Sequence, residues 1–527
     1  GINASRALSI AAKKGGYSLG RVQTPTLSMI CKRFLENKNF QSVPYWQIKL
    51  TIEKAGIRCK AVSDTKFEDN AIARSVCNAY FADKTGLLTV SKIERKTVDT
   101  EPPFLFDLTN LQKETNRKHG FSADKTLSIA QSLYEKKLIT YPRTGSRYIG
   151  EDVFEEIPSL IENLHIHPIF GNYARTLSQK MLNKRSVNDA KVTDHHALLI
   201  TENLPDRLTA DEQIIYDCIA SRMLEAFSEK STQEVQNVVF SIGEYLFKTK
   251  NSRLLVSGWR SVLNEKTETD ENETVQTELP NFMQDETIPV QSHEITQHQT
   301  KPKPLYNEAT LLSAMETAGK EVADEEAKAA MKECGLGTPA TRAAIIETLI
   351  IRDYIVREKK SLIPTEKGLA VFEIVKDRKI ADAEMTGSWE KALADIETGK
   401  MNAETFHKGI EIYTRQICKE LLSLSFSNNS TNLMDCPKCK TKNLIFYPKV
   451  AKCKECDFLV FREICGLLLS DEHLKALFTE GKTPLLKGLT AKSDKKFNAR
   501  LVLNADHTTS FAFEPNKKSD TKYNRKP

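Results

Sequence analysis

The sequence predicts an α+β protein made of several domains, and three observations lead to this conclusion. The chain has 527 residues, which is too long for one hydrophobic core of ordinary size. Stretches with helical periodicity alternate along it with stretches of strand-type alternation. Close to its end, two pairs of cysteines flank a short apolar run, which is typical of a small metal-stabilised module. The elements behind this prediction are taken in chain order below.

The first part of the chain changes from helix to strand and back to helix. The first forty residues read as helical, interrupted by the glycine-containing stretch KKGGYSLGRVQTPTLS. Pro44 then opens a strand, YWQIKLTI, in which apolar residues alternate. From Phe104 the pattern is helical again, and Ser122 is the expected N-cap of the helix ADKTLSIAQSLYEKK. The short apolar stretch LITY, residues 138–141, is expected to be extended.

The middle of the chain is expected to be β-rich and the following part helical. The helix ADEQIIYDCIASRMLEAF leads into strands near VQNVVFSI and YLFKTK. The passage from Asn264 to Thr300 holds nine acidic residues against one lysine, and we expect loops and short strands there. Asn307 is the expected N-cap of the next helix. Beyond it, a helix, the strand DYIVRE, the strand SLIPT and a helix capped by Thr365 form the pattern of a winged-helix module.

Composition limits the class of protein. The net charge of +6 and the pI of about 8.5 permit nucleic-acid binding without requiring it. No apolar run is long enough to span a membrane, and no signal peptide is recognisable. Seven of the eleven cysteines stand singly, as in reduced proteins of the cytoplasm, which is the expected location. Because the sequence does not begin with methionine, we expect a fragment or a processed piece.

The stretch KKLITYPRTGSRYI combines a phenol and a guanidinium in a way that suits phosphate chemistry. Pro142 keeps Tyr141 out of the α region, and in an extended backbone Tyr141 and Arg143 project from the same face. A phenol has a pKa of about 10 and needs help to attack a phosphodiester. An arginine beside it can bind the phosphate and stabilise the developing charge. On this spacing alone, a packed tyrosine beside a surface arginine is the better interpretation.

Two further motifs favour a phosphate-binding site over a purely structural role for Tyr141 and Arg143. DHHALLIT supplies His195 and His196 about fifty residues downstream. SLGRVQTP offers glycine, serine and backbone N–H groups beside Arg21, which would suit a sugar-phosphate backbone. Taken singly, each motif also fits a structural role, as core histidines or as an ordinary glycine turn.

Together and in this order, four motifs resemble the signatures of type IA DNA topoisomerases of the topoisomerase III kind: SLGRVQTPTLSMI, LITYPRTGSRYI, TDHHALLIT and GLGTPATRAAIIETLIIRDYI. The resemblance covers residues 1 to about 422. It implies that Tyr141 attacks a single-strand phosphodiester and forms a 5′-phosphotyrosyl bond, that another strand passes, and that the break is rejoined without ATP. It also implies that Arg143 orients the phosphate and that His195, rather than His196, contacts it.

The expected DNA-binding residues are Arg6, Ser18, Leu19, Gly20, Arg21, Val22 and Gln23. The expected partner is single-stranded and underwound DNA, with no membrane involved.

The resemblance implies a toroid with a split domain arrangement, winged-helix-like modules and a β-rich arch. The expected boundaries are 1–42 and 301–425 for the helical DNA-groove domain, 43–103 and 229–300 for the arch, 104–228 for the tyrosine domain, 430–462 for a zinc ribbon, 463–514 for a small C-terminal topoisomerase repeat and 515–527 for a disordered basic tail.

The sequence departs from the family in three respects, one of which is that HHALLIT replaces the usual proline-containing ending. Gly145 stands where the family usually has an acid. More importantly, the family holds Mg²⁺ with a D-x-D-x-E trio in a domain that precedes this segment, and no such trio occurs here. We therefore expect these 527 residues alone to bind single-stranded DNA without relaxing supercoils.

The cysteine pairs predict a metal site independently of the resemblance. CPKC and CKEC are separated by thirteen residues, a spacing that suits a tetrahedral structural zinc ribbon. The expected ligands are Cys436, Cys439, Cys453 and Cys456. The alternative is a ribbon that has lost its metal or forms disulfides.

Two other functions remain open from the sequence. Relaxases and replication initiators also cut one strand with a tyrosine and use a His-hydrophobic-His metal motif, which LHIHP at His165 and His167 resembles. The residues around it, however, look like a helix end and a loop. The other alternative is an inactive fragment that only binds single-stranded DNA.

Overall fold

The computed structural model describes residues 1–13, 15–82, 86–263, 273–275, 278–321, 335–424, 434–441, 443–447, 450–491 and 496–513. The chain divides into two compact units, Gly1–Leu421 and Leu422–Pro527. The predicted disordered tail, 515–527, lies outside the described residues. None of the described helices is both long and apolar enough to cross a membrane.

Helices from the two ends of the first unit pack together as one part, which we call the helical base. Helix α2 contacts α11, α12 and strand β9, although more than 300 residues of chain separate them. Asn307 and Thr365 cap their helices as predicted, and β8 pairs antiparallel with β9 as the expected wing. The elements of the base are α1 (Ile2–Ala11), α2 (Gln23–Lys38), α9 (Glu308–Glu316), α11 (Pro339–Ile351), β8 (Ile355–Glu358), β9 (Ser361–Pro364), α12 (Glu366–Val375), α13 (Ala383–Glu397) and α14 (Ala403–Leu422).

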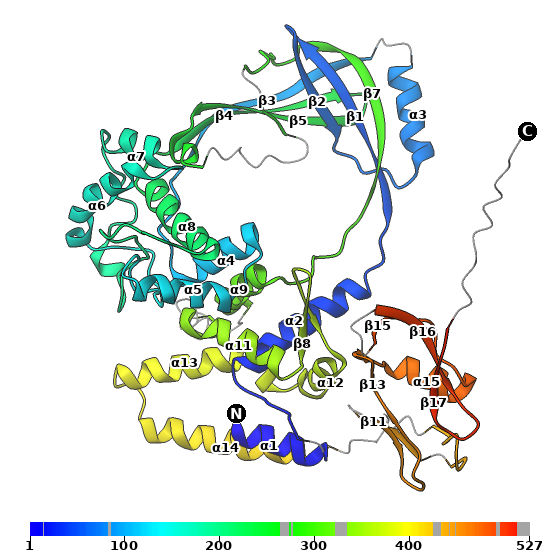
Figure 1. Ribbon diagram of the computed structural model, residues 1–527. Helices are drawn as coiled ribbons and strands as arrows, with labels where there is room; N and C mark the ends of the chain where they lie inside the picture. Colours follow the sequence, from blue (N-terminus) through cyan, green and yellow to red (C-terminus); the bar gives the residue numbers. More distant parts are fainter. Residues whose placement is uncertain are drawn as a thin grey trace, which may run out of the picture. The chain divides into compact units, whose positions relative to one another are not determined.

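A seven-stranded sheet, called the arch, has the strand order β2-β1-β7-β3-β4-β5-β6 (Figure 1). Because β2 also pairs with β5, the strands close on themselves around an apolar core, and α3 (Asn70–Phe81) packs against β1 and β7. The strands are β1 (Pro44–Lys54), β2 (Ile57–Ser63), β3 (Leu87–Thr100), β4 (Ser231–Ile242), β5 (Tyr245–Val256), β6 (Glu273–Val275) and β7 (Thr287–Gln299).

The expected loops and short strands between Asn264 and Thr300 do not account for one long strand that this passage contributes to the arch. Strand β7 is 13 residues long and pairs with both β1 and β3. Only Ile288 and Val290 of this strand are buried, while most of its other side chains are polar and accessible. The apolar alternation that marks a strand in a sequence is therefore missing from most of β7.

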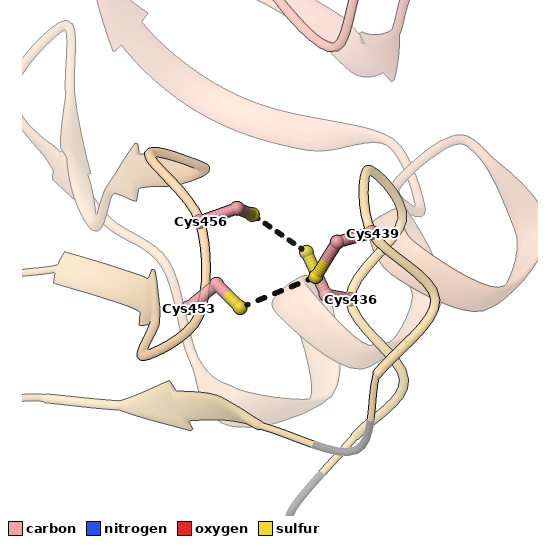
Figure 2. Close-up of side chains that lie close together, drawn as sticks. All are labelled: Cys436, Cys439, Cys453 and Cys456. Carbon is pink, nitrogen blue, oxygen red and sulfur yellow. Dashed lines mark hydrogen bonds between the residues drawn. The ribbon is translucent and has the colours of Figure 1, made fainter.

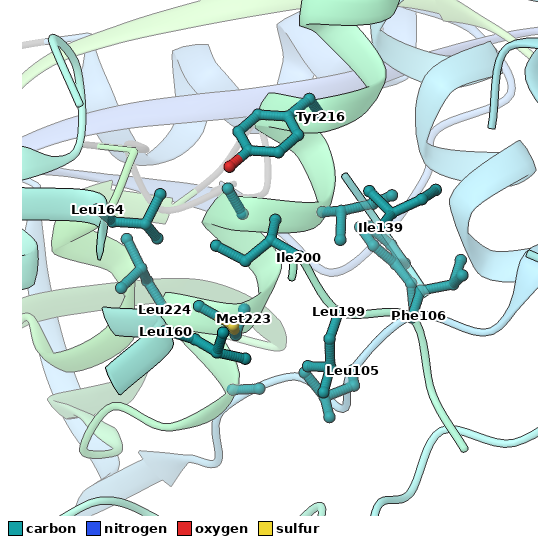
Figure 3. Packing of buried hydrophobic residues seen from close by; sticks show 14 of the residues in the cluster. Leu105, Phe106, Ile139, Leu160, Leu164, Leu199, Ile200, Tyr216, Met223 and Leu224 are labelled. Atoms are coloured by element: carbon teal, nitrogen blue, oxygen red, sulfur yellow. The ribbon is translucent and has the colours of Figure 1, made fainter. Parts of the chain in front are cut away.

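The part of the chain that carries Tyr141, residues 104–228, forms its own hydrophobic core (Figure 3). We call it the tyrosine segment. Its helices surround two extended stretches, 138–149 and 194–200, and Ser122 caps α5 as predicted. The helices are α4 (Leu108–His119), α5 (Ala123–Glu135), α6 (Glu151–Asn163), α7 (Gly171–Leu177) and α8 (Ala210–Ala226).

The three parts of the first unit form a closed circuit. The arch continues from the base through β1 and β7, and it continues into the tyrosine segment through β3 and β4. The tyrosine segment in turn contacts the base, since α4 packs against α9 and α11, and α5 against α11. The N–H of Ala123 donates to a carboxylate oxygen of Glu308 at 2.6 Å, and the N–H of Ala309 donates to Oδ1 of Asn116 at 3.2 Å. This circuit is the arrangement expected of a toroid.

The second unit is a small β-rich body with one hydrophobic core. That core joins the cysteine-bearing strands to the following repeat: Phe446 and Phe458 both pack against Phe478 of α15, with ring centroids 5.9 and 5.6 Å away. The elements are β10 (Leu444–Phe446), β11 (Val450–Cys453), β12 (Leu459–Phe461), β13 (Glu463–Ile464), β14 (Leu467–Leu468), α15 (Asp471–Glu480), β15 (Leu486–Thr490), β16 (Lys496–Leu503) and β17 (Thr509–Ala512).

Candidate active site and metal centre

Tyr141 lies on an extended segment that follows α5. Ile139 pairs with Ile200, and the N–H of Thr140 donates to the carbonyl oxygen of Leu199 at 3.0 Å, so the segment is fixed against residues 194–200. Beyond Tyr141 the side chains alternate between the two faces. The buried positions are Pro142, Thr144 and Ser146, and the exposed ones are Arg143, Gly145 and Arg147.

The ring of Tyr141 is half-buried between two other rings. Tyr134, in the last turn of α5, lies edge-on to it with centroids 5.3 Å apart, and the His195 ring lies 4.7 Å away. The structure therefore brings together two of the three predicted catalytic residues. His196 is turned elsewhere, because its Nδ1 lies 2.7 Å from the carbonyl oxygen of Ala197.

The backbone of His195 is held directly by the tyrosine-bearing segment. The hydroxyl of Thr144 donates to the carbonyl oxygen of His195 at 2.9 Å, and the N–H of Ala197 donates to the carbonyl oxygen of Tyr148 at 2.9 Å. The N–H of Leu108, at the start of α4, donates to the carbonyl oxygen of Thr144 at 3.1 Å. The relative position of Tyr141 and His195 thus depends on backbone hydrogen bonds rather than on long flexible side chains.

Two exposed arginines near Tyr141 differ in their surroundings. Nε of Arg147 lies 3.8 Å from Oδ2 of Asp107, and its guanidinium covers the ring of Phe104. Asp107 is the N-cap of α4, and burial raises the pKa of its carboxyl. Arg143, by contrast, has no hydrogen bond or ion pair with any described residue. Its guanidinium is free to bind an anion, which is what the predicted role requires.

The predicted groove residues form a structured turn before α2. The N–H of Ser18 donates to the hydroxyl of Tyr354 at 2.6 Å, and the Ser18 hydroxyl lies 3.0 Å from Oε1 of Gln23. Leu19 is buried, and the hydroxyl of Ser5 bonds both its N–H and its carbonyl oxygen. Among the remaining positions, Arg6 is exposed on α1, and Gly20, Arg21 and Val22 are partly accessible.

Arg21 has an internal partner. Its Nη1 lies 2.9 Å from a carboxylate oxygen of Glu390 on α13, and its carbonyl oxygen accepts from Thr386. Both contacts are with the base, so Arg21 must exchange Glu390 for phosphate to bind DNA through its guanidinium.

A glycine-containing turn before α11 lies between the groove turn and the tyrosine-bearing segment. A Cβ added to Gly337, whose φ is +75°, would lie 3.4 Å from Cγ1 of Val22. A Cβ added to Gly145 would lie 3.4 Å from Cγ of Pro339. Three of the four motifs quoted above therefore meet.

Sequence reasoning missed two residues that position this site. Tyr134 was read only as part of a helical face, and nothing in its spacing indicated the contact with Tyr141. Glu308 follows the predicted N-cap Asn307, and nothing in the sequence indicated that it is buried and bridges to the tyrosine segment. Long-range contacts of this kind leave no local pattern in a sequence.

The alternative His-hydrophobic-His motif has different partners for its two rings. His165 lies in a short 3-10 turn, Leu164–Ile166, with its Nε2 2.9 Å from the hydroxyl of Ser178. Nε2 of His167 lies 3.1 Å from Oδ1 of Asp217, and its ring stacks on Phe170. The expected helix end is confirmed, and the two imidazoles do not converge on a common ligand position.

The four predicted zinc ligands converge in the second unit (Figure 2). Sγ of Cys436 lies 3.6 Å from Sγ of Cys456, and Sγ of Cys439 lies 3.6 Å from Sγ of Cys453. Ligands about 2.3 Å from a tetrahedral zinc are separated by about 3.8 Å, so the spacing fits this ion. The hydroxyl of Thr441 lies 3.0 Å from Sγ of Cys439, and hydrogen bonds from Thr441 lower the pKa of that thiol to about 6, whereas burial and the neighbouring cysteines raise the pKa of Cys456 to about 12.

Comparison with known proteins covers both units. The family described as "DNA topoisomerase" matches residues 1–408, and the "C-terminal repeat of topoisomerase" matches residues 455–514. DNA topoisomerase 3 of Bacillus licheniformis is 35% identical over 450 residues, and DNA topoisomerase 3 of Bacillus subtilis is 34% identical over 453 residues. Each alignment covers 83% of this chain and 61% of the relative, so the chain spans about three fifths of these relatives. Full-length topoisomerase I of Thermotoga maritima is similar in structure, with a TM-score of 0.58 and 26% identity over 84% of this chain and 70% of that one.

Proposed function

This chain belongs to the DNA topoisomerase family, and from that premise we propose that it supplies the strand-cleaving part of an ATP-independent type IA topoisomerase. The observation that carries the proposal is the placement of Tyr141 against His195, with the unpaired Arg143 two residues further on. All three lie within the matched residues 1–408.

The proposed reaction begins with the phenol oxygen of Tyr141. It attacks the phosphorus of a single-strand phosphodiester as its proton leaves, and a 5′-phosphotyrosyl bond replaces the bond to the 3′ oxygen. The departing 3′ oxygen takes up a proton and becomes a free hydroxyl. After another strand has passed through the break, this hydroxyl attacks the phosphotyrosine and restores both the DNA and the phenol.

Arg143 and His195 would act on the phosphate during both transfers. The guanidinium of Arg143 can bind two phosphate oxygens at once and stabilise the charge that develops on them. The imidazole of His195, already against the Tyr141 ring, would contact the same phosphate. Because the covalent intermediate conserves bond energy, no ATP is required, and the chain has no G-x-x-x-x-G-K-[ST] loop.

The proposed substrate is single-stranded or underwound DNA in the cytoplasm. Arg6 and residues 18–23 would contact its sugar-phosphate backbone, with backbone N–H groups and side chains setting the position of the strand rather than its sequence. The domain boundaries given under Sequence analysis are part of this proposal. The ribbon and repeat, 430–462 and 463–514, share one core and form a single body.

Two metal ions belong to the proposal in different ways. Cys436, Cys439, Cys453 and Cys456 would hold a structural Zn²⁺, which would stabilise the second unit. Mg²⁺ is implied by the family resemblance, but in the described part of the chain no carboxylate cluster comes close enough together to hold an ion. No step is therefore assigned to Mg²⁺ through these residues.

The decisive experiment replaces the proposed nucleophile in the full-length gene product. Labelled single-stranded DNA is incubated with the protein, which is then denatured, and protein-linked label is measured. We expect Tyr141→Phe to abolish the adduct while single-strand affinity stays within about twofold, because one oxygen is removed and little shape changes. Tyr134→Phe, which alters the adjacent ring, should still form the adduct. An adduct formed by Tyr141→Phe would overturn the proposal.

A further inference from the structure

A cleft of about 230 Å³ lies beside α2 and extends along the helix from Pro25 to Glu36. One helical face lines it, because the contributing positions follow the spacing i, i+3, i+4, i+7, i+8 and i+11. These residues are Pro25, Ser28, Met29, Lys32, Arg33 and Glu36. Across the cleft lie Lys303 and Tyr306, and the junction before α13 supplies Asp382.

Some charged groups of this cleft form contacts within the protein, and others have no partner among the described residues. Arg33 covers the ring of Tyr306 at 4.2 Å and donates to the carbonyl oxygen of Pro304, so it forms part of the wall. Asp382 caps α13 by accepting from the N–H of Glu384. The ammonium groups of Lys32 and Lys303, however, have no hydrogen-bond or ion-pair partner among the described residues.

The wall of the cleft also contains a buried hydroxyl group that makes no hydrogen bond with the described residues. Ser28 is 2% exposed, and among the described residues no hydrogen-bond partner lies within reach of its hydroxyl. A buried polar group without a partner costs free energy that a ligand can return. Ser28 and Lys32 are one helical turn apart on the same face of α2, so both groups border the same space.

We infer that this cleft binds a phosphodiester of the single strand whose scissile phosphate meets Tyr141. The inference rests on the proposed function and extends it to a second phosphate position. Three cations and two carboxylates line the cleft, and this small positive excess suits the single negative charge of a phosphodiester. The volume is below the roughly 300–1,000 Å³ of pockets that enclose small-molecule ligands, so a short piece of a longer chain fits better than a whole cofactor.

The length of α2 between Gln23 and Lys32 sets the distance from the groove turn to the cleft. Gln23 begins the helix at the groove turn and Lys32 lies nine residues later, which is about 14 Å along the helix axis. A single DNA strand rises by at least about 3.4 Å per nucleotide, so four nucleotides or fewer cover that length. The cleft should therefore contribute only to oligonucleotides long enough to reach from the groove turn to Lys32.

The test measures binding of oligo(dT), from the dinucleotide to about 16 nucleotides long, to the 527-residue chain over a range of salt concentrations. The double variant Lys32→Ala, Lys303→Ala should bind the longest oligonucleotides about fivefold more weakly, the equivalent of one net hydrogen bond. Its salt dependence should fall by about 0.7 in log–log slope, as for one lost phosphate contact. The shortest oligonucleotides should show no change.

Two controls test whether weaker DNA binding by the double variant has another cause, such as a general loss of positive charge or unfolding. Lys38→Ala removes an exposed lysine at the end of the same helix, outside the cleft, and should leave both the affinity and its length dependence unchanged. Thermal unfolding checks that each variant is folded.

The possible outcomes have distinct meanings. Wild-type affinity in the double variant, or an equal loss at every length, overturns the second phosphate position. If the double variant binds inorganic phosphate more weakly than the wild type but binds oligo(dT) equally well, the cleft is a site for free phosphate, and the DNA assignment is wrong. If the unaltered chain binds no single-stranded DNA at all, the proposed function fails instead.

Discussion

The rings of Tyr141 and His195 lie 4.7 Å apart with their planes inclined by 59°. The two residues are more than fifty positions apart in the sequence, and hydrogen bonds between their extended segments hold them together. A phenol and an imidazole in contact, beside an unpaired guanidinium, can converge on one phosphate without a large rearrangement of the backbone.

Arg143 is predicted to accelerate covalent-bond formation without being the nucleophile. Arg143→Ala should slow adduct formation by the full-length gene product about 10²- to 10³-fold, because one charge-stabilising donor is lost. Arg143→Lys should restore the charge but not the bidentate contact, and so recover only part of the rate. Single-turnover measurement of the DNA adduct tests both variants.

Arg147 provides the matched control for that experiment. It is exposed on the same face as Arg143, but its guanidinium is engaged by Asp107 and Phe104. Arg147→Ala should therefore slow the reaction by less than about tenfold. Equal losses in the two alanine variants would show that general positive charge, rather than Arg143 itself, is what the site requires.

Glu308 is predicted to hold the tyrosine segment against the helical base. Its carboxylate is 4% exposed, accepts from the N–H of Ala123 at the start of α5, and lies 2.7 Å from Nε of Arg357. Glu308→Ala leaves both donors unpaired and should cost about 2 kcal/mol. We expect faster amide hydrogen exchange in the first turn of α5 and a lower free energy of unfolding.

Glu347 separates this role from the stability of the wing. It also binds Arg357, through the other end of the guanidinium, but has no contact with Ala123 in the described structure. Glu347→Ala should leave hydrogen exchange at the start of α5 unchanged, and Glu308→Gln should lie between wild type and Glu308→Ala. Unchanged exchange in Glu308→Ala would refute the contact.

Local patterns were enough to predict much of the helical base and the zinc site. Asn307, Ser122 and Thr365 cap helices because their side chains satisfy nearby N–H groups, and that chemistry is visible within four residues of sequence. The convergence of the four cysteines was likewise predictable, because short spacings place the members of each pair side by side.

Apart from α3, the arch and the surroundings of Tyr141 could not be predicted in the same way. Helix α3 does carry an apolar face at helical spacing, with Ala73, Val76, Cys77 and Phe81 buried, so it was predictable from local pattern. Strand β7, by contrast, depends on pairing with β1 across more than 230 residues of chain. The contacts of Tyr141 with Tyr134 and of Gly145 with Pro339 are also tertiary. For these features only the family resemblance carried information, and it concerned the motifs rather than the contacts.

The four cysteines are predicted to bind one zinc ion per chain. Because Phe446 and Phe458 pack on Phe478, the appropriate fragment is 434–513 rather than the ribbon alone. Elemental analysis should give one zinc per fragment, and a chelator should lower its unfolding temperature markedly, since structural zinc contributes directly to folding. Cys456→Ser should weaken zinc binding in the same way.

A cysteine of the second unit outside this set is the control. Cys465 lies in the same unit and packs against the same core without belonging to the four-sulfur cluster. Cys465→Ser should keep the zinc ion. A fragment that folds equally well without metal would show that the cluster is not a structural zinc site.

The last prediction concerns catalysis by these 527 residues on their own. Cleavage and rejoining need a group that donates a proton to the 3′ oxygen and removes it again, and arginine cannot exchange a proton at neutral pH. A histidine that contacts the phosphate, as proposed for His195, is poorly placed to supply this proton transfer as well. No D-x-D-x-E trio is present in the sequence to hold the Mg²⁺ that the family resemblance implies.

We therefore expect the 527-residue chain to bind single-stranded DNA but to leave a negatively supercoiled plasmid unrelaxed, with or without Mg²⁺. Relaxation by the 527 residues unaided would show that the missing acid–base chemistry resides within them, and the search for it would then begin with the titratable groups around Tyr141.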